Sequence, residues 1–262
     1  MSETVRAAVI EEYVKVLKLP GVGGEYAALA RQAREEQWAY EDFLRDLLEI
    51  EVRSRQERTA ARRLRQARFP DPKTLDQLDW KALEGISRPK VLELASGQYL
   101  DQGEDIVIAG PIGTGKTHLA IALGVEATRR RFRVAFVRAA ELVRSLLEAK
   151  DERTLGRLYR RFQKTDLLIV DELGFVPFER AGGEVLFNLF SQRYERKSTL
   201  VTTNLSFGEW VQVFGDEKLT TALLDRLGHH AHILTTRGSS YRTRKRQLPQ
   251  PQKEGAKNTQ IP

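Results

Sequence analysis

Residues 110–117 read Gly-Pro-Ile-Gly-Thr-Gly-Lys-Thr, a complete G-x-x-x-x-G-K-[ST] phosphate-binding loop. An apolar run at 105–109 precedes the loop and a helix-like run follows it, which is the context that such a loop requires. The glycines allow successive backbone N–H groups to face an anion, and the helix N-terminus adds a favourable dipole. We therefore predict that the chain binds a nucleoside triphosphate. The expected contact residues are Gly110, Pro111, Ile112, Gly113, Thr114, Gly115, Lys116, Thr117 and His118.

Two carboxylates complete this predicted site. Asp171 and Glu172 follow an apolar, strand-like run that starts at Asp166. We expect Lys116 to reach the β- and γ-phosphate oxygens, and the hydroxyl of Thr117 together with Asp171 to hold Mg²⁺. Glu172 would orient or deprotonate the attacking water. The pattern thus indicates hydrolysis of bound ATP in addition to binding.

A polar amide is expected at the same edge of the sheet. Asn204 ends the run Leu200-Val-Thr-Thr-Asn204, which has the composition of a buried strand. Ligands of open α/β folds bind at the carboxyl ends of the strands. Asn204 is therefore a candidate to hydrogen-bond the γ-phosphate or the water.

The elements that must position these residues form an α/β pattern. Short β-rich runs alternate with helical ones from residue 105 onward, which predicts a five-stranded parallel sheet with right-handed crossovers and flanking helices. The expected strands are 105–109, 133–138, 167–170, 199–203 and 232–235.

A small all-α domain is predicted at the N-terminus, over residues 1–68. Its helical pattern is interrupted at 20–24, Pro-Gly-Val-Gly-Gly, and then runs from Tyr26 to Arg68 without Gly or Pro. The Pro-rich segment 69–72 marks the boundary with the nucleotide-binding domain, expected at 69–246. Residues 247–262 lack apolar periodicity and are expected to form a disordered tail.

The chain has 262 residues, no Cys, and 43 Lys plus Arg against 36 Asp plus Glu. The absence of Cys excludes disulfides and thiolate sites. We expect no membrane span and no targeting segment at the N-terminus, and hence a cytoplasmic protein.

The basic side chains are concentrated in three patches. Residues 53–68 have seven Arg and one Glu, residues 144–164 have seven basic and three acidic side chains, and residues 237–262 have seven basic side chains and one Glu. Such clustering is typical of a protein that binds a polyanion, although a solvated helix face has the same composition. Candidates for contacts with the DNA backbone are Arg144, Lys150, Arg153, Arg157, Arg160 and Arg161.

The phosphate loop, the two carboxylates and Asn204 together resemble the Walker A, Walker B and sensor-1 motifs of AAA+ ATPases over residues 69–246. Further short motifs resemble IstB-type transposition helper ATPases of insertion sequences, which are related to helicase loaders and replication initiators. These motifs are Phe69-Pro-x-x-Lys73-Thr-Leu-x-x-Leu78-Asp-Trp80, Asp171-Glu-Leu-Gly, Arg193-Tyr194-Glu195, Ser206-Phe-x-Glu-Trp210, Leu224-Asp-Arg226-Leu and Ser240-Tyr-Arg242.

The resemblance implies roles for two more arginines. Arg226 corresponds to an arginine finger that acts on the nucleotide of a neighbouring subunit, and Arg242 to a sensor-2 residue that contacts the nucleotide of its own subunit. A ring or helical homo-oligomer would then be needed for hydrolysis. The resemblance also places 144–164 where related initiators insert a helix facing the central channel. The short stretch after Asn204 implies a reduced or absent lid.

The function implied is an ATP-dependent helper that self-assembles on double-stranded target DNA and recruits or stimulates its partner transposase. The alternative is a DnaC-like helicase loader, which would bind single-stranded DNA and a replicative helicase. A metabolic P-loop kinase is disfavoured because no small-substrate module is recognisable.

Overall fold

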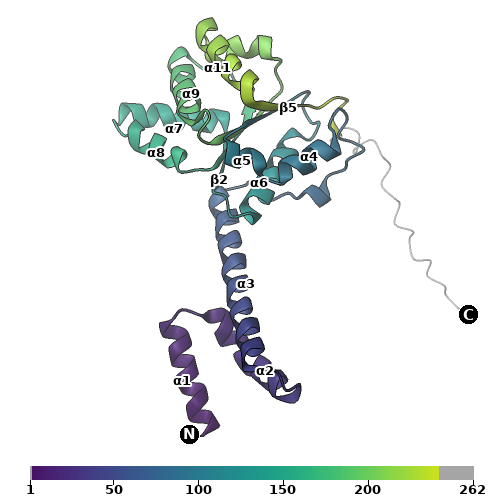
Figure 1. Ribbon diagram of the computed structural model, residues 1–262. Coiled ribbons are helices and arrows are strands. Elements are labelled where there is room, and N and C mark those ends of the chain that lie inside the picture. Colours follow the sequence, from purple (N-terminus) through teal and green to yellow (C-terminus); the bar gives the residue numbers. More distant parts are fainter. Residues whose placement is uncertain (1, 242–262) are drawn as a thin grey trace, which may run out of the picture.

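The structure, a computed structural model, describes residues 2–241 (Figure 1). Arg242 and the predicted tail at 247–262 lie outside the described residues. Three N-terminal helices lead into an α/β region that is built around a single sheet. Figure 1 shows α3 as a long rod between the first two helices and the edge of the sheet. The bounds of the three helices are α1 Glu3–Val16, α2 Pro20–Glu35 and α3 Tyr40–Ala67.

The expected break at 20–24 is wrong, because this segment forms the first turns of α2. Pro20 suits the first turn of a helix, because backbone N–H groups there have no acceptor within the helix and the missing N–H of Pro costs no hydrogen bond. The carboxylate of Glu51 on α3 accepts hydrogen bonds from the backbone N–H groups of Gly21 (2.8 Å) and Val22 (3.2 Å). A side chain from another helix therefore caps α2, which local sequence does not reveal.

The expected uninterrupted helix from Tyr26 to Arg68 is also wrong, since α2 ends at Glu35 and α3 begins at Tyr40. Gln37 takes a left-handed conformation (φ 54°), which ends a helix. The indole N–H of Trp38 donates to Glu36 (2.7 Å) and its backbone N–H donates to the carbonyl of Ala33 (2.9 Å). The turn between α2 and α3 contains neither Gly nor Pro, and local hydrogen bonds of Trp38 fix it instead.

The junction between the N-terminal helices and the α/β region is continuous. The last turns of α3 pack against α6 and β2, so the helix is anchored on the sheet layer. The division of the chain at Arg68 therefore stays a prediction. Between α3 and the first strand lie the short helices η1 Leu75–Gln77, α4 Arg88–Ala95 and α5 Gln98–Gln102.

The predicted five-stranded parallel sheet is confirmed. Its strand order is β2-β3-β4-β1-β5, and every neighbouring pair is parallel. The strands are β1 Asp105–Ala109, β2 Val134–Arg138, β3 Leu167–Leu173, β4 Ser198–Thr203 and β5 Ala231–Thr235. Because β1 lies between β4 and the edge strand β5, the phosphate loop follows an inner strand of the sheet.

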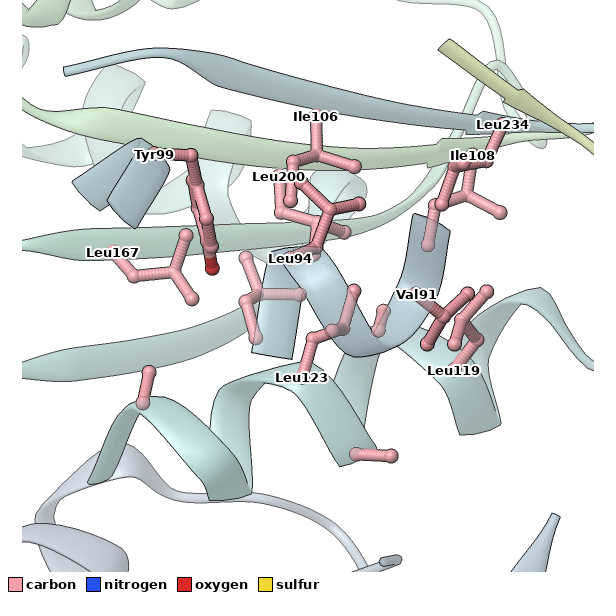
Figure 2. Packing of buried hydrophobic residues seen from close by; sticks show 14 of the residues in the cluster. Val91, Leu94, Tyr99, Ile106, Ile108, Leu119, Leu123, Leu167, Leu200 and Leu234 are labelled. Carbon is pink, nitrogen blue, oxygen red and sulfur yellow. The ribbon is translucent and has the colours of Figure 1, made fainter. Parts of the chain in front are cut away.

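Helices cover both faces of this sheet. Side chains alternate along β1, so that Ile106 and Ile108 face one layer and Val107 faces the other. Figure 2 shows the first layer, in which Ile106 and Ile108 of the sheet belong to one buried cluster with Val91 and Leu94 of α4 and Leu119 and Leu123 of α6. The remaining helices are α6 Lys116–Arg129, α7 Ala139–Asp151, α8 Leu155–Gln163, α9 Arg180–Arg193, η2 Phe207–Trp210, α10 Val211–Phe214 and α11 Glu217–His230.

The second layer packs α7, α9, α10 and α11 against the sheet. The buried guanidinium of Arg193 joins α9 to the ends of α8 and β4, donating to the carbonyls of Phe162 (2.5 Å), Thr165 (3.0 Å) and Ser198 (2.5 Å). Within residues 2–241, no helix has both the length and the apolar character of a membrane span. The described chain ends at Tyr241, so the reduced lid stays a prediction.

Candidate nucleotide-binding site

The phosphate loop is held in shape by the segment that follows β5. Gly110 has φ 142°, and a Cβ atom there would lie 2.2 Å from the Oγ1 of Thr236. The N–H of Thr236 donates to the carbonyl of Ala109 (2.8 Å), and its hydroxyl is 2.7 Å from that of Thr114. Only glycine therefore fits at position 110, and Thr236 fixes both ends of the turn.

The same segment contacts the loop a second time at Gly113. This glycine has φ 82°, and a Cβ atom there would lie 2.3 Å from the Oγ of Ser240. The backbone N–H of Tyr241 donates to the carbonyl of Gly113 (3.0 Å). The motif Ser240-Tyr-Arg242 thus begins against the phosphate loop, while Arg242 itself lies outside the described residues.

Lys116 lies beneath the loop and is almost fully buried. Its ammonium group donates to the carbonyls of Gly110 and Pro111, each at 2.7 Å. Burial lowers the pKa of Lys116, and the nearby charges of Asp171 and Glu172 oppose this shift. The ammonium is therefore positioned inside the loop, where it can exchange carbonyl partners for phosphate oxygens.

Asp171 is positioned by two hydroxyl groups. The hydroxyl of Thr117 donates to its Oδ1 (2.9 Å) and Oδ2 (3.2 Å), and that of Thr202 donates to its Oδ1 (2.5 Å). Magnesium prefers oxygen ligands and is usually held by one or two carboxylates together with phosphates and waters. The adjacent hydroxyl of Thr117 and carboxylate of Asp171 fit such an ion.

Thr202 is a functional candidate that the sequence argument missed. Besides Asp171, its hydroxyl contacts the backbone N–H of Glu172, from which it accepts a hydrogen bond of 2.9 Å. It lies on β4, the neighbour of β3, and is fully buried. β4 reads Ser-Thr-Leu-Val-Thr-Thr, so the sequence offers four hydroxyl residues and no signal that singles out Thr202. Its partners depend on the strand register.

Glu172 points away from the sheet. Its backbone is left-handed (φ 61°), and the pairing of β3 with β4 is irregular between Val170 and Leu173. The side chain is 49% exposed, and its Oε2 lies 3.7 Å from the Nε of Arg138 at the end of β2. This bulge frees the carboxylate for contact with water, and it brings in Arg138, which the sequence argument did not single out.

One cleft of about 480 Å³ collects these groups. It is lined by the loop from Ile112 to His118 and by Asp171, Glu172 and Asn204, so the structure brings together the side chains predicted from three separate segments. Sequence reasoning missed the opposite wall, which comes from the segment before α4. The further lining residues include Lys73, Gln77, Leu78, Asp79, Leu83, Ile121, Phe136, Arg138, Thr202 and Tyr241.

His118 lies in this cleft at the first turn of α6. Burial lowers the pKa of His118, while a hydrogen bond with the backbone of Thr74 opposes that shift. Its Nε2 is buried and has no hydrogen-bond partner among the described residues. The imidazole of His118 is therefore part of the wall of the cleft, tied to Thr74.

Arg226 does not line this cleft. It lies on α11 and donates to the hydroxyl of Ser191, while its guanidinium stacks over Phe187 (5.2 Å) and Tyr194 (5.9 Å) of the α9 segment. The structure thus places Arg226 on the α9–α11 face of its own subunit. Its action on a neighbouring subunit stays a prediction.

The six candidate DNA contacts are exposed and fall into two groups. Arg144, Lys150 and Arg153 lie on α7 or directly after it, and the Nε of Arg144 is 4.0 Å from Glu148. Arg157, Arg160 and Arg161 lie on α8 and line an open cavity of about 930 Å³ together with the end of α3. We call this the basic cavity. Its cationic residues are Arg62, Arg63, Arg65, Arg68, Arg133, Arg157, Arg160, Arg161 and Lys164.

A family model and individual relatives of known proteins point to the same family. The family model described as IstB-like ATP binding protein matches residues 12–249. The chain is 37% identical over 239 residues to the IS5376 insertion-sequence ATP-binding protein of Geobacillus stearothermophilus, covering 91% of this chain and 95% of the relative. It is 38% identical over 237 residues to the IS21 insertion-sequence ATP-binding protein of Pseudomonas aeruginosa, covering 90% and 89%.

Solved structures share the fold at lower identity. The chain resembles AMPPCP-bound DnaA from Aquifex aeolicus with a TM-score of 0.55 and 20% identity, over 68% of this chain and 54% of that one. It resembles the DnaC helicase loader with a TM-score of 0.51 and 21% identity, over 64% and 93%. Both likenesses concern the AAA+ fold.

Proposed function

Because the chain belongs to the IstB-like family of ATP-binding proteins and has the AAA+ ATPase fold, we propose that it is an ATP-dependent transposition helper. In this proposal it self-assembles on double-stranded target DNA and recruits or stimulates its partner transposase. Relatives with 37% and 38% identity are ATP-binding proteins of the insertion sequences IS5376 and IS21. Their length matches that of this chain, which supports a shared role.

Hydrolysis is assigned to the cleft. The observation that carries this assignment is the convergence of Lys116, Thr117, Asp171 and Glu172 on one cleft beside the phosphate loop. Lys116 would neutralise phosphate charge, Thr117 and Asp171 would hold Mg²⁺, and Asn204 would hydrogen-bond the γ-phosphate or the water. Bound Mg²⁺·ATP would supply the phosphoryl group that is cleaved.

Glu172 is the proposed base because its carboxylate leaves the sheet at the bulge and remains half exposed. Arg138, whose Nε lies 3.7 Å from Oε2, would orient this carboxylate. Thr202 fixes the backbone of Glu172 and the side chain of Asp171 together. The two carboxylates therefore have separate tasks set by their surroundings.

The test is ATP-dependent assembly on DNA. Wild-type protein with Mg²⁺ and ATP should form large complexes on duplex DNA in sedimentation, and these should increase strand transfer by the transposase of the neighbouring reading frame. Lys116→Ala, which removes the phosphate ligand, should do neither, whereas Lys218→Ala on the exposed face of α11 serves as the matched control. Equal assembly by Lys116→Ala would contradict ATP dependence.

The alternative is a helicase loader, which the fold shared with the DnaC loader brings into consideration. A loader is expected to prefer single-stranded DNA and to bind a replicative helicase. Binding of labelled single- and double-stranded oligonucleotides of the same sequence separates the two. Preference for the single strand, together with no effect on strand transfer, would favour the loader.

A further inference from the structure

We propose that the basic cavity is a binding site for the backbone phosphates of duplex DNA, in which the end of α3 and helix α8 hold the same stretch of DNA. The inference rests on the proposed function in taking duplex DNA as the partner, and it adds the α3 wall and Arg133 to the predicted contacts. DNA bound there would touch the N-terminal helices and the ATPase region at once.

The cavity forms where two distant basic patches meet. Its walls are α3 and α8, and its floor is the start of β2, the edge strand of the sheet. Figure 1 shows the end of α3 beside β2. Leu155, Leu158 and Phe162 pack α8 into the second core layer, so its arginines face outward. The packing of α8 on the core thus fixes the direction of its basic side chains.

The spacing of these rows suits a chain of phosphates. Arg157, Arg160 and Arg161 of α8, and Lys164 directly after it, follow at intervals of three and four residues, which places them on one helix face. Residues three or four apart in a helix rise about 5 Å along its axis. A linear polyanion can therefore meet successive guanidinium groups of one wall.

The charge of the cavity is compensated only to a small extent by the protein. No acidic side chain lines it, and none of its nine cationic groups forms an ion pair with another described residue. Asp166, which interacts electrostatically with Arg63 and Arg133, is bonded to Lys197 (2.5 Å) and to the backbone N–H of Arg133 (2.9 Å). About 15 Å of duplex carries a comparable number of negative charges.

Arg63 shows the consequence of this crowding. Its Nε is buried without a hydrogen-bond partner in the described part of the chain. Burial and the positive charges of Arg133 and Arg62 lower the pKa of its guanidinium. Anionic oxygens in the cavity would relieve this like-charge repulsion.

The lining favours the DNA backbone over bases. Apart from its charged and polar residues it contains only Val134 and Ala135, and no aromatic side chain. Single-stranded nucleic acid is bound largely by stacking of its bases on aromatic rings, whereas duplex DNA is bound through its phosphates. The cavity therefore fits a duplex that is held without regard to sequence.

The experiment measures duplex binding of the full chain as a function of salt, by fluorescence anisotropy between about 0.05 and 0.2 M NaCl. In Arg62→Gln/Arg65→Gln we expect the slope of log K against log salt to become shallower by about 2. Affinity at about 0.1 M salt should fall about 50-fold. The control Arg31→Gln/Arg34→Gln removes the same charge from exposed positions on α2 and should match wild type.

Cross-linking gives a second, local readout. Because the chain has no Cys, Gln66→Cys in the cavity can carry a single photo-activated cross-linker. We expect adducts with duplex DNA at this position and none with Gln32→Cys on α2. Circular dichroism of each variant verifies that the helices are intact.

Three outcomes would overturn the proposal. If Arg62→Gln/Arg65→Gln keeps the wild-type affinity and slope while Arg144→Gln/Lys150→Gln loses them, DNA binds elsewhere and the proposed function stands. If the α3 variant keeps DNA binding but no longer self-assembles in sedimentation, the cavity takes carboxylates of a second copy. If the wild type does not bind duplex DNA, the proposed function itself fails.

Discussion

Thr117 and Asp171, which lie 54 residues apart in sequence, share a hydrogen bond of 2.9 Å between the hydroxyl and the carboxylate Oδ1. The first comes from the start of α6 and the second from β3. Because β3 and β1 are both parallel neighbours of β4, the end of β3 reaches the loop that follows β1. The contact joins the phosphate loop to the carboxylate that we assign to Mg²⁺.

Removing the hydroxyl of Thr202 should loosen this arrangement. Thr202→Val keeps the volume but deletes the hydrogen bond to Asp171 and leaves the N–H of Glu172 without its acceptor. Partners of metal ligands typically contribute 10- to 100-fold to affinity or activity. We expect ATP hydrolysis to fall about 10-fold or more, with a higher Mg²⁺ requirement in a titration at fixed ATP. Thr202→Ser should restore most of the activity, and a Thr202→Val variant with wild-type Mg²⁺ dependence would exclude this role.

Replacing the proposed base separates binding from hydrolysis. Glu172→Gln retains the shape of the side chain but cannot accept a proton, so turnover should fall by about 10²- to 10⁴-fold. Binding of a fluorescent ATP analogue and of duplex DNA should persist, since Glu172 contacts neither Lys116 nor Asp171 through a hydrogen bond. The exposed Glu179→Gln serves as the control. Unchanged turnover of Glu172→Gln would remove it as the group that activates water.

Much of the cleft could be predicted because it depends on short-range pattern. The phosphate loop is a contiguous motif, Asp171 and Glu172 end an apolar run, and Asn204 ends a run with the composition of a strand. A parallel sheet brings the carboxyl ends of such runs to one edge. The wall formed by Leu78 and Leu83 could not be predicted, because its position depends on how the segment after α3 folds back over the sheet.

Other features depend on tertiary packing that no local signal encodes. Arg62 and Arg160 belong to patches about a hundred residues apart, and only the packing of α3 on β2 brings them to one cavity. The start of α2 at Pro20 depends on Glu51, which lies thirty residues from Gly21. Pro and Gly there favoured a loop by propensity, and the capping carboxylate overrode it.

Glu51 also makes the N-terminal helices sensitive to pH. Burial alone would raise the pKa of Glu51, but hydrogen bonds from Arg55 and from the backbone of Val22 and Gly21 lower it below its ordinary value. A carboxyl group with a lowered pKa stabilises the folded state above its unfolded pKa, and this stabilisation is lost as the pH falls through the folded pKa.

We therefore expect Glu51→Gln to destabilise the packing of α2 on α3 by about 2 kcal/mol at pH 7, as for loss of hydrogen bonds to a charged group. The difference from wild type should shrink as the pH is lowered below about 4. Thermal unfolding followed by circular dichroism at several pH values measures it. Glu49→Gln, which removes a solvent-exposed partner of Arg53, is the matched control and should have little effect. A pH-independent difference would contradict the assignment to the Glu51 charge.

Action of Arg226 between subunits can be tested by mixing variants. Arg226→Ala should lower ATP turnover by about 10³- to 10⁵-fold if the guanidinium stabilises transferring phosphate. Lys116→Ala should be inactive because it lacks the ammonium group that contacts the phosphates. In a mixed assembly, some interfaces join an intact nucleotide cleft to an intact Arg226 of the next subunit, so activity should reappear and reach a maximum at intermediate ratios.

The position of Arg226 supplies the control for this experiment. Its guanidinium lies over Phe187 and Tyr194, so its loss could disturb the α9–α11 face without any role at a phosphate. Arg226→Lys retains the charge but loses the planar group, and a merely structural defect would appear as a lower melting temperature in both variants. Absence of rescue at every ratio, with normal melting and normal assembly of the mixture, would show that Arg226 does not act on a neighbouring subunit.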